Sequence, residues 1–270
     1  MEPKSKRNNF LFMSSIRLFS LLFCLSILII ITIPIQTLLN IFRFKLKYIY
    51  PLFFYKVITN ITGLNIHTEG FNEEDKKGTG TLYIANHVSW FDILCLGSVL
   101  NARFIAKKEV SSMGIFGFLA KLSNTFFIDN SNKNKIYQYN NFIREKLISG
   151  ESLILFPEGT TSDGNGIRKF KSSLFECLNS TESSINVQSI SICYSRKNNL
   201  PMGIYYRRFI AWIGETSMVD SMKKYLASGP ITVNLIFHSK ICMNQFNNRK
   251  ELSSFCEKQI LSGLNKTIKI

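Results

Sequence analysis

An uncharged apolar run between Arg17 and Arg43 constrains the fold of this chain more than any other feature. It reads LFSLLFCLSILIIITIPIQTLLNIF, and because a bilayer core takes about 20 helical residues, it is long enough to cross a membrane. A cleaved secretory signal has a shorter apolar core followed by small residues, whereas Gln36-Thr37-Leu38-Leu39 follows here. We therefore predict a retained membrane helix, with a cleaved signal and an interfacial helix as the alternatives.

The flanks of this run leave its orientation open. Four cations precede it and four follow it, namely Lys4, Lys6, Arg7 and Arg17, then Arg43, Lys45, Lys47 and Lys56. The positive-inside rule does not choose between such flanks, so a half-inserted hairpin with both ends in the cytosol is also allowed. Pro34 predicts a kink or an end of the helix. The aromatic segment 48–55 is too short to span and predicts an interfacial piece.

Composition narrows the class of protein. The chain has 270 residues, 46% of them hydrophobic, which excludes global disorder. Its net charge of +15 suits anionic lipid headgroups or nucleic acid, but no nucleic-acid module appears, so we expect no nucleic-acid partner. The six cysteines form no C-x-x-C pair and the three histidines show no ligand spacing. We therefore expect reduced thiols and no metal site.

Beyond the apolar run the pattern becomes globular. We divide the chain into residues 1–56, with the membrane helix and the interfacial segment, and residues 57–270, an α/β domain. Short apolar strands alternating with helices predict a mostly parallel sheet covered by helices on both faces. Candidate strands are 81–85, 103–106, 125–128, 152–156, 187–193 and 231–238, and candidate helices are 90–100, 109–122, 134–149, 171–179, 219–227 and 248–265.

The first chemical motif is Asn86-His87-Val88-Ser89-Trp90-Phe91-Asp92, directly after a predicted strand. One reading is a helix start, in which Ser89 and Asp92 cap the following helix. The other places His87 in the turn, where Asp92 reaches back to its imidazole and fixes the tautomer. Since no G-x-S-x-G is present, His87 would act as general base toward a substrate hydroxyl.

The second motif follows the strand at 152–156 and reads Pro157-Glu158-Gly159-Thr160-Thr161-Ser162-Asp163-Gly164. It is compatible with an ordinary turn. The carboxyl ends of strands in α/β folds are also where ligands bind, so a carboxylate and hydroxyls here indicate a binding loop.

The two motifs in this order, behind a membrane anchor, resemble the glycerolipid acyltransferase family, whose best-known members acylate 1-acyl-glycerol-3-phosphate. The resemblance covers about residues 60–240. It implies an α/β acyltransferase fold, a catalytic dyad of His87 and Asp92, and an acceptor-binding loop of Glu158, Gly159 and Thr160. It implies an acyl-CoA or acyl carrier protein as donor, membrane lipids as partners and no cofactor. The expected localisation of the protein is a bacterial inner membrane, with the catalytic domain on the cytoplasmic side.

The chain departs from the family pattern at Asn130 and Thr161, where many members carry arginine. The missing cations would have been phosphate ligands. Basic residues near the same predicted loops are the candidate replacements: Lys107, Lys108, Lys133, Arg168, Lys169 and Lys171. The EGTTSDG variant also resembles relatives that acylate lyso-ornithine lipid, whose headgroup is not a phosphate.

We expect acylation of the sn-2 hydroxyl of 1-acyl-glycerol-3-phosphate, which gives phosphatidic acid for phospholipid synthesis. Acylation of another lysolipid, such as lyso-ornithine lipid, is the alternative. A lipid hydrolase and a non-enzymatic membrane-anchored binding protein are further alternatives. Residues 114–119 (GIFGFL) are either a buried helix face or part of an acyl trough.

Overall fold

The computed structural model describes residues 4–129, 133–178, 185–214 and 217–268. Its first element is one long helix, α1 (Lys4–Ile41). Within the described residues one segment, Phe19–Ile41, is long and apolar enough to cross a membrane. The helix continues past Pro34 to Ile41, so of the two expectations for Pro34, a kink or an end of the helix, the end is wrong. A proline loses one hydrogen bond to the preceding turn, which so apolar a helix tolerates.

A tight hairpin returns the chain from α1. Arg43, with φ of 54°, turns it into a short 3₁₀ segment, η1 (Lys45–Tyr48), and α2 (Tyr50–Thr62) follows. Gly63, with φ of 78°, ends α2 in the left-handed conformation that glycine adopts without a steric cost. The predicted interfacial segment is thus the start of a longer helix, and α2 runs across the predicted domain boundary at residue 56.

The sheet has nine strands in the described residues, in the order β1-β8-β6-β2-β5-β3-β4, with β7 and β9 paired to β6. The strands are β1 (Leu64–Glu69), β2 (Leu82–Ala85), β3 (Arg103–Lys107), β4 (Phe126–Ile128), β5 (Leu153–Leu155), β6 (Asn186–Lys197), β7 (Leu200–Pro201), β8 (Ile231–Phe237) and β9 (Ile241–Cys242). All six predicted strands are present, and β1, β7 and β9 were not predicted. The pairing of β6 with β8 is antiparallel, so the sheet is mixed, with a parallel block on either side of that pair.

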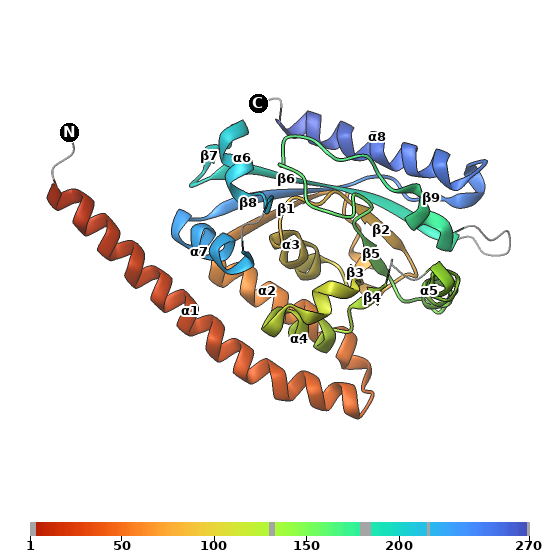
Figure 1. The fold of residues 1–270 in the computed structure, drawn as a ribbon, viewed down its shortest axis with the longest axis horizontal. Coiled ribbons are helices and arrows are strands. Elements are labelled where there is room, and N and C mark those ends of the chain that lie inside the picture. Colours follow the sequence, from red (N-terminus) through yellow and green to blue (C-terminus); the bar gives the residue numbers. More distant parts are fainter. Residues whose placement is uncertain (1–3, 130–132, 179–184, 215–216, 269–270) are drawn as a thin grey trace.

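Helices cover both faces of the sheet (Figure 1). They are α3 (Phe91–Val99), α4 (Gly114–Leu122), α5 (Lys133–Ile148), α6 (Ile204–Ile210), α7 (Met218–Ser228) and α8 (Arg249–Ile268). One apolar core lies between the sheet and α2, α3 and α7, and a second lies between the sheet and α5 and α8. The prediction of an α/β sheet covered on both faces is therefore confirmed. The region 171–179 is a 3₁₀ segment, η4 (Ser172–Leu178), instead of an α-helix.

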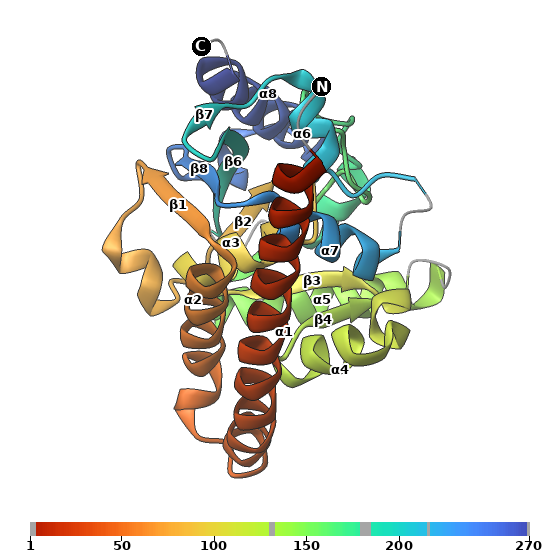
Figure 2. The same cartoon turned by 90° about the vertical axis from the view of Figure 1, so that its left-hand side faces the viewer.

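Helix α1 lies along the domain beside α2, α4 and α7 (Figure 2). One of its faces packs on the core through Leu22, Leu25 and Ile29. The opposite face carries exposed apolar side chains along the whole apolar segment: Phe19, Phe23, Ile27, Ile30, Ile31, Ile35, Leu38 and Ile41. So large an apolar surface is typical of a site that contacts lipid.

Deleting residues 1–43 is expected to release much of the protein from membranes, because it removes this apolar surface. Part of the truncated protein should stay on the membrane, because the basic, apolar α2 region still binds its surface. Ile30→Lys is the milder variant, since Ile30 is 69% exposed and points away from the core. Fractionation of membranes without detergent measures both. Recovery of the full-length protein in the soluble fraction after low-salt lysis would contradict the membrane helix.

Candidate active site

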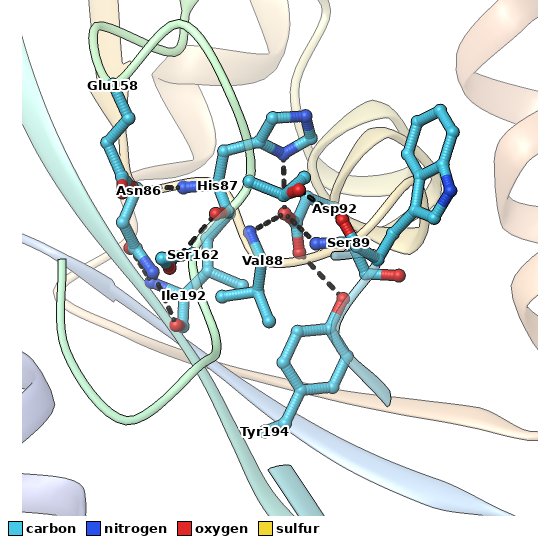
Figure 3. A network of polar contacts seen from close by, with 11 residues as sticks. Asn86, His87, Val88, Ser89, Asp92, Glu158, Ser162, Ile192 and Tyr194 are labelled. Atoms are coloured by element: carbon cyan, nitrogen blue, oxygen red, sulfur yellow. Dashed lines mark hydrogen bonds and ion pairs between the residues drawn. The ribbon is translucent and has the colours of Figure 1, made fainter. Parts of the chain in front are cut away.

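The turn between β2 and α3 carries the first motif at the carboxyl end of a central strand. The Asn86 side chain fastens this turn to the neighbouring strand β6. Its Nδ2 donates to the Ile192 carbonyl at 3.0 Å, and its Oδ1 accepts from the Ile192 N–H at 2.7 Å (Figure 3). Asn86 is fully buried, so the position of the following residue, His87, is set by the sheet.

Asp92 is fully buried and accepts four hydrogen bonds. Its Oδ2 lies 2.8 Å from His87 Nδ1 and accepts from the N–H groups of Val88 and Ser89 at 2.6 and 2.9 Å. Its Oδ1 accepts from the Tyr194 hydroxyl at 2.7 Å. These two N–H groups belong to the turn before α3, whose N-cap residue Trp90 has no side-chain cap, and the buried Ser89 hydroxyl has no hydrogen-bond partner in the described residues. The expected cap by Ser89 is therefore wrong, whereas Asp92 lies in the first turn of α3 and orients the imidazole of His87.

The second imidazole nitrogen of His87 points away from Asp92 (Figure 3). Since a carboxylate at Nδ1 favours the proton there, Nε2 is left as the acceptor. Phe156 stacks on the imidazole with ring centroids 4.2 Å apart, which holds the plane of the ring. His87 is thus oriented on one nitrogen and available as a base on the other.

Beside His87 lies a cavity of about 670 Å³ with mostly apolar walls. Its walls come from α1, α2, α3, α4 and α7 as well as from the loop after β5. Helix α4 contributes Ile115, Phe116 and Leu119, while Gly117 alone is buried in that helix. One face of the segment 114–119 is therefore a cavity wall, and the alternative of a buried helix face is wrong. A cavity of this size and polarity suits one or more fatty chains.

Glu158 joins the two motifs. Its side chain is 2% exposed, its Oε1 accepts from the His87 N–H at 2.7 Å, and its Oε2 accepts from the Arg168 N–H at 2.6 Å. Burial raises the pKa of Glu158 to about 7, although the two N–H groups and His87 favour the charged form. Both oxygens hold backbone, so we assign Glu158 to positioning of the turn at His87.

The pKa of Glu158 predicts a pH dependence of stability. Because its pKa rises from 4.5 to about 7 on folding, the native state holds this proton more tightly than the unfolded chain. The stabilisation is complete below pH 4.5 and is lost as the pH rises to about 7, by roughly 3 kcal/mol at most. Denaturant unfolding of wild type and Glu158→Gln is measured over this pH range. As the pH rises from 4.5 to about 7, the unfolding free energy of the wild type should fall relative to that of Glu158→Gln. A constant difference would contradict the raised pKa.

The loop after Glu158 is fastened to both sides of the cavity. The Ser162 N–H donates to the His87 carbonyl at 2.7 Å, and the Thr161 hydroxyl donates to the Trp212 carbonyl. The Trp212 N–H in turn donates to the Val88 carbonyl at 2.9 Å. Gly159, Thr160 and Trp212 line the cavity. The two motifs and the segment after α6 thus form one hydrogen-bonded rim around His87.

Comparison with known proteins agrees with this geometry. The family model described as Acyltransferase matches residues 65–194, which include both motifs. A protein named lyso-ornithine lipid O-acyltransferase from Brucella abortus is 31% identical over 94% of this chain and 96% of its own length. The chain belongs to the acyltransferase family.

The fold of the acyltransferase also has a solved counterpart. The crystal structure of the 1-acyl-sn-glycerophosphate acyltransferase PlsC from Thermotoga maritima superposes with a TM-score of 0.67, at 20% identity over 95% of this chain and 97% of the other. A protein named 1-acyl-sn-glycerol-3-phosphate acyltransferase from Neisseria gonorrhoeae is 34% identical, over 43% of this chain and 46% of its own length. The predicted family and fold are confirmed.

The basic residues predicted to bind the acceptor separate into two groups in the acyltransferase. Lys107 and Arg168 line the cavity, and Arg168 Nε donates to the Thr161 carbonyl at 3.0 Å. Lys108 instead pairs with Asp129 at 2.9 Å and is not among the lining residues. The Lys171 side chain lies over Gly159. Asn130 lies outside the described residues, as does the side chain of Lys133.

Several site residues of the acyltransferase were not predicted to have a role. Asn86 and Ser162 stand inside the quoted motifs, so their positions could have been found there. Tyr194 lies on β6 and Trp212 follows α6, with no local pattern that links either to His87. In the described part of the chain no three His, Cys, Asp or Glu residues gather as metal ligands.

Proposed function

We propose that this acyltransferase transfers a fatty acyl group from a thioester to the free hydroxyl of lyso-ornithine lipid. The similarity to the Brucella abortus protein, which extends over 94% of the chain, is the observation that carries the proposal. The similarity to the Neisseria gonorrhoeae protein extends over 43%. The alternative acceptor of the sequence analysis is thus better supported than 1-acyl-glycerol-3-phosphate.

The rim of the cavity supports the same acceptor. Where many relatives carry an arginine, the hydroxyl of Thr161 is used to hold the Trp212 carbonyl. Of the predicted cations, Lys107 and Arg168 line the cavity, while Lys108 is neutralised by Asp129. A phosphomonoester carries nearly two negative charges near neutral pH, whereas the ornithine headgroup carries one carboxylate and one ammonium. The loss of the arginine at Thr161 therefore favours the headgroup with the smaller negative charge.

The geometry of His87 supports direct transfer. The lysolipid hydroxyl gives its proton to Nε2 while its oxygen attacks the thioester carbonyl, and Asp92 stabilises the resulting imidazolium. A tetrahedral oxyanion forms, for which backbone N–H groups of the loop after Glu158 are the candidate donors. The carbon–sulfur bond then breaks, and the proton on His87 passes to the leaving thiolate. CoA and acyl carrier protein both present such a thioester, and the mechanism uses no further cofactor.

The packing of α1 supports entry of both lipids from a membrane. Leu22 and Gln36, near the two ends of its apolar segment Phe19–Ile41, line the same cavity, and they are separated by about 21 Å along a helix that rises 1.5 Å per residue. Asn40 Nδ2 also donates to the Leu122 carbonyl of α4. Because α1 packs on the domain along its apolar segment, an α1 that spanned the bilayer would place part of the polar domain inside the bilayer. We therefore infer that α1 lies in one leaflet. The candidate thioester donors, acyl-CoA and acyl carrier protein, are cytoplasmic, so we propose that the domain lies on the cytoplasmic face.

The acceptor is tested by initial rates with purified protein in mixed micelles. We expect kcat/KM for lyso-ornithine lipid to exceed that for 1-acyl-glycerol-3-phosphate by at least about tenfold, the value of one lost charge-assisted contact. Lys107→Gln should lower kcat/KM for lyso-ornithine lipid by roughly tenfold, and Lys108→Gln, the matched control, by less than about twofold. If 1-acyl-glycerol-3-phosphate were acylated faster than lyso-ornithine lipid, it would be the acceptor instead.

A further inference from the structure

A second cleft, of about 340 Å³, lies on the other face of the sheet from His87. Adjacent side chains of a strand point to opposite faces, and Tyr194 points toward Asp92, so its neighbour Cys193 faces the other side, where it packs in the core with α8. Cys193 lines the second cleft, as do Ser195 and Arg196 at the irregularity in β6. The cleft is closed by α6 and by the end of α8, and α8 lies across the sheet from α1 and α2 (Figure 1).

A buried guanidinium forms part of this cleft. Arg207 is 5% exposed, its Nε donates to Asn165 Oδ1 at 2.8 Å, and its Nη1 donates to the Met202 carbonyl. In the described part of the chain Arg207 forms no ion pair, and its two hydrogen bonds go to neutral oxygens. A buried charge is costly unless an opposite charge accompanies it. Arg207 is therefore held in place with its charge uncompensated.

The other lining groups favour an anion. Arg196 and His67 line the cleft, and no acidic residue does. Asn234 lies opposite His67 in the β1–β8 register and opposite Cys193 in the β6–β8 register. Its Oδ1 accepts from the Ser195 hydroxyl at 2.5 Å, which leaves its amide N–H groups as donors. The cleft thus combines guanidinium groups with neutral hydrogen-bond donors.

We propose that this cleft binds a small phosphate-bearing molecule from solution. Guanidinium groups bind phosphate oxygens in pairs, with a geometry that a single ammonium does not offer. The volume exceeds what one phosphate fills, so a phosphate ester fits. Exposed apolar side chains of α6, Ile204 and Tyr205, lie beside the cleft, so a lipid headgroup is the competing ligand, and the test includes it.

The probe is inorganic phosphate, titrated against the full chain in detergent micelles at constant ionic strength made up with chloride. We expect a saturable rise in melting temperature, of about 3–6 °C at ten times the dissociation constant. The melting temperature is measured without acyl transfer, so the result does not depend on the proposed acceptor. Equal melting temperatures in phosphate and chloride would overturn the proposal. So would a rise with phosphatidylglycerol micelles and none with inorganic phosphate.

Two neighbouring residues give a matched pair of variants. Arg196→Gln removes a lining cation and should weaken phosphate binding by roughly tenfold or more. Lys197→Gln removes the same charge from a side chain that lies over Tyr206 and Phe209, outside the cleft, and should leave the dissociation constant unchanged. Arg207 is the less informative position, because it also holds Asn165. An equal effect of the two variants would show general salt stabilisation and overturn the site.

Discussion

Replacing His87 with alanine is expected to lower kcat for acyl transfer at least about a thousandfold. The imidazole is the group that Asp92 orients at 2.8 Å and that faces the apolar cavity, and a positioned general base contributes about 10²–10⁴-fold, more when it acts within a dyad. The side chain is part-exposed, so its loss leaves the fold and the membrane association intact. Initial rates with membranes of equal protein content measure the effect.

The control for this variant is Tyr137→Ala on α5, which truncates a ring that is 73% exposed and should change kcat by less than about twofold. Thermal unfolding and membrane fractionation of both variants show whether they fold. A folded, membrane-bound His87→Ala protein with near wild-type turnover would remove His87 from the mechanism.

Asp92→Asn is expected to lower kcat by roughly 10³–10⁴-fold, because the amide removes the charge that stabilises the imidazolium. The amide oxygen can still accept from Val88 and Ser89, and its nitrogen can donate to the Tyr194 hydroxyl, which rotates. The geometry at 2.6–2.9 Å is therefore preserved while the charge is lost. Asp92→Asn should therefore lower kcat strongly and the free energy of unfolding only slightly.

Tyr194→Phe is the companion to Asp92→Asn. It removes one of the four donors to Asp92, the hydroxyl at 2.7 Å, and leaves the carboxylate charged. We expect kcat to fall by less than about tenfold, the value of one charge-assisted hydrogen bond. A Tyr194→Phe defect as large as that of Asp92→Asn would mean that geometry, and not charge, is what Asp92 contributes.

The parts of the site that could be predicted are those that local sequence determines. His87 and Asp92 share one turn, and Glu158 follows one strand, so strand-to-loop patterns indicated where they lie. The roles were harder to predict. Glu158 was expected to bind the acceptor, yet its two oxygens hold the backbone of His87 and Arg168. Which partner a buried carboxylate finds depends on contacts between distant segments, which no spacing encodes.

The fold shows the same division. Each of the six predicted strands is rich in apolar residues, whereas β1 reads LNIHTE and is mostly exposed, so its pairing with β8 left no clear pattern. The mixed sheet follows from the antiparallel pairing of β6 and β8, although α7 lies between them in the chain and suggested a parallel crossover. The cavity depends on α1, whose apolar run predicted a lipid contact and could not reveal that one face of it packs beside His87.

The central claim is that the lysolipid hydroxyl attacks the thioester directly, with His87 as the general base and with no acyl group on the protein. A single-turnover experiment with excess enzyme and a radiolabelled acyl thioester tests it most directly, with lipid products and intact-protein mass followed in the same samples. With lyso-ornithine lipid present, the account predicts that label passes to the diacylated lipid and that the protein mass does not change; without it, the thioester persists. Label on the protein, or free fatty acid released at the same rate without acceptor, would contradict it.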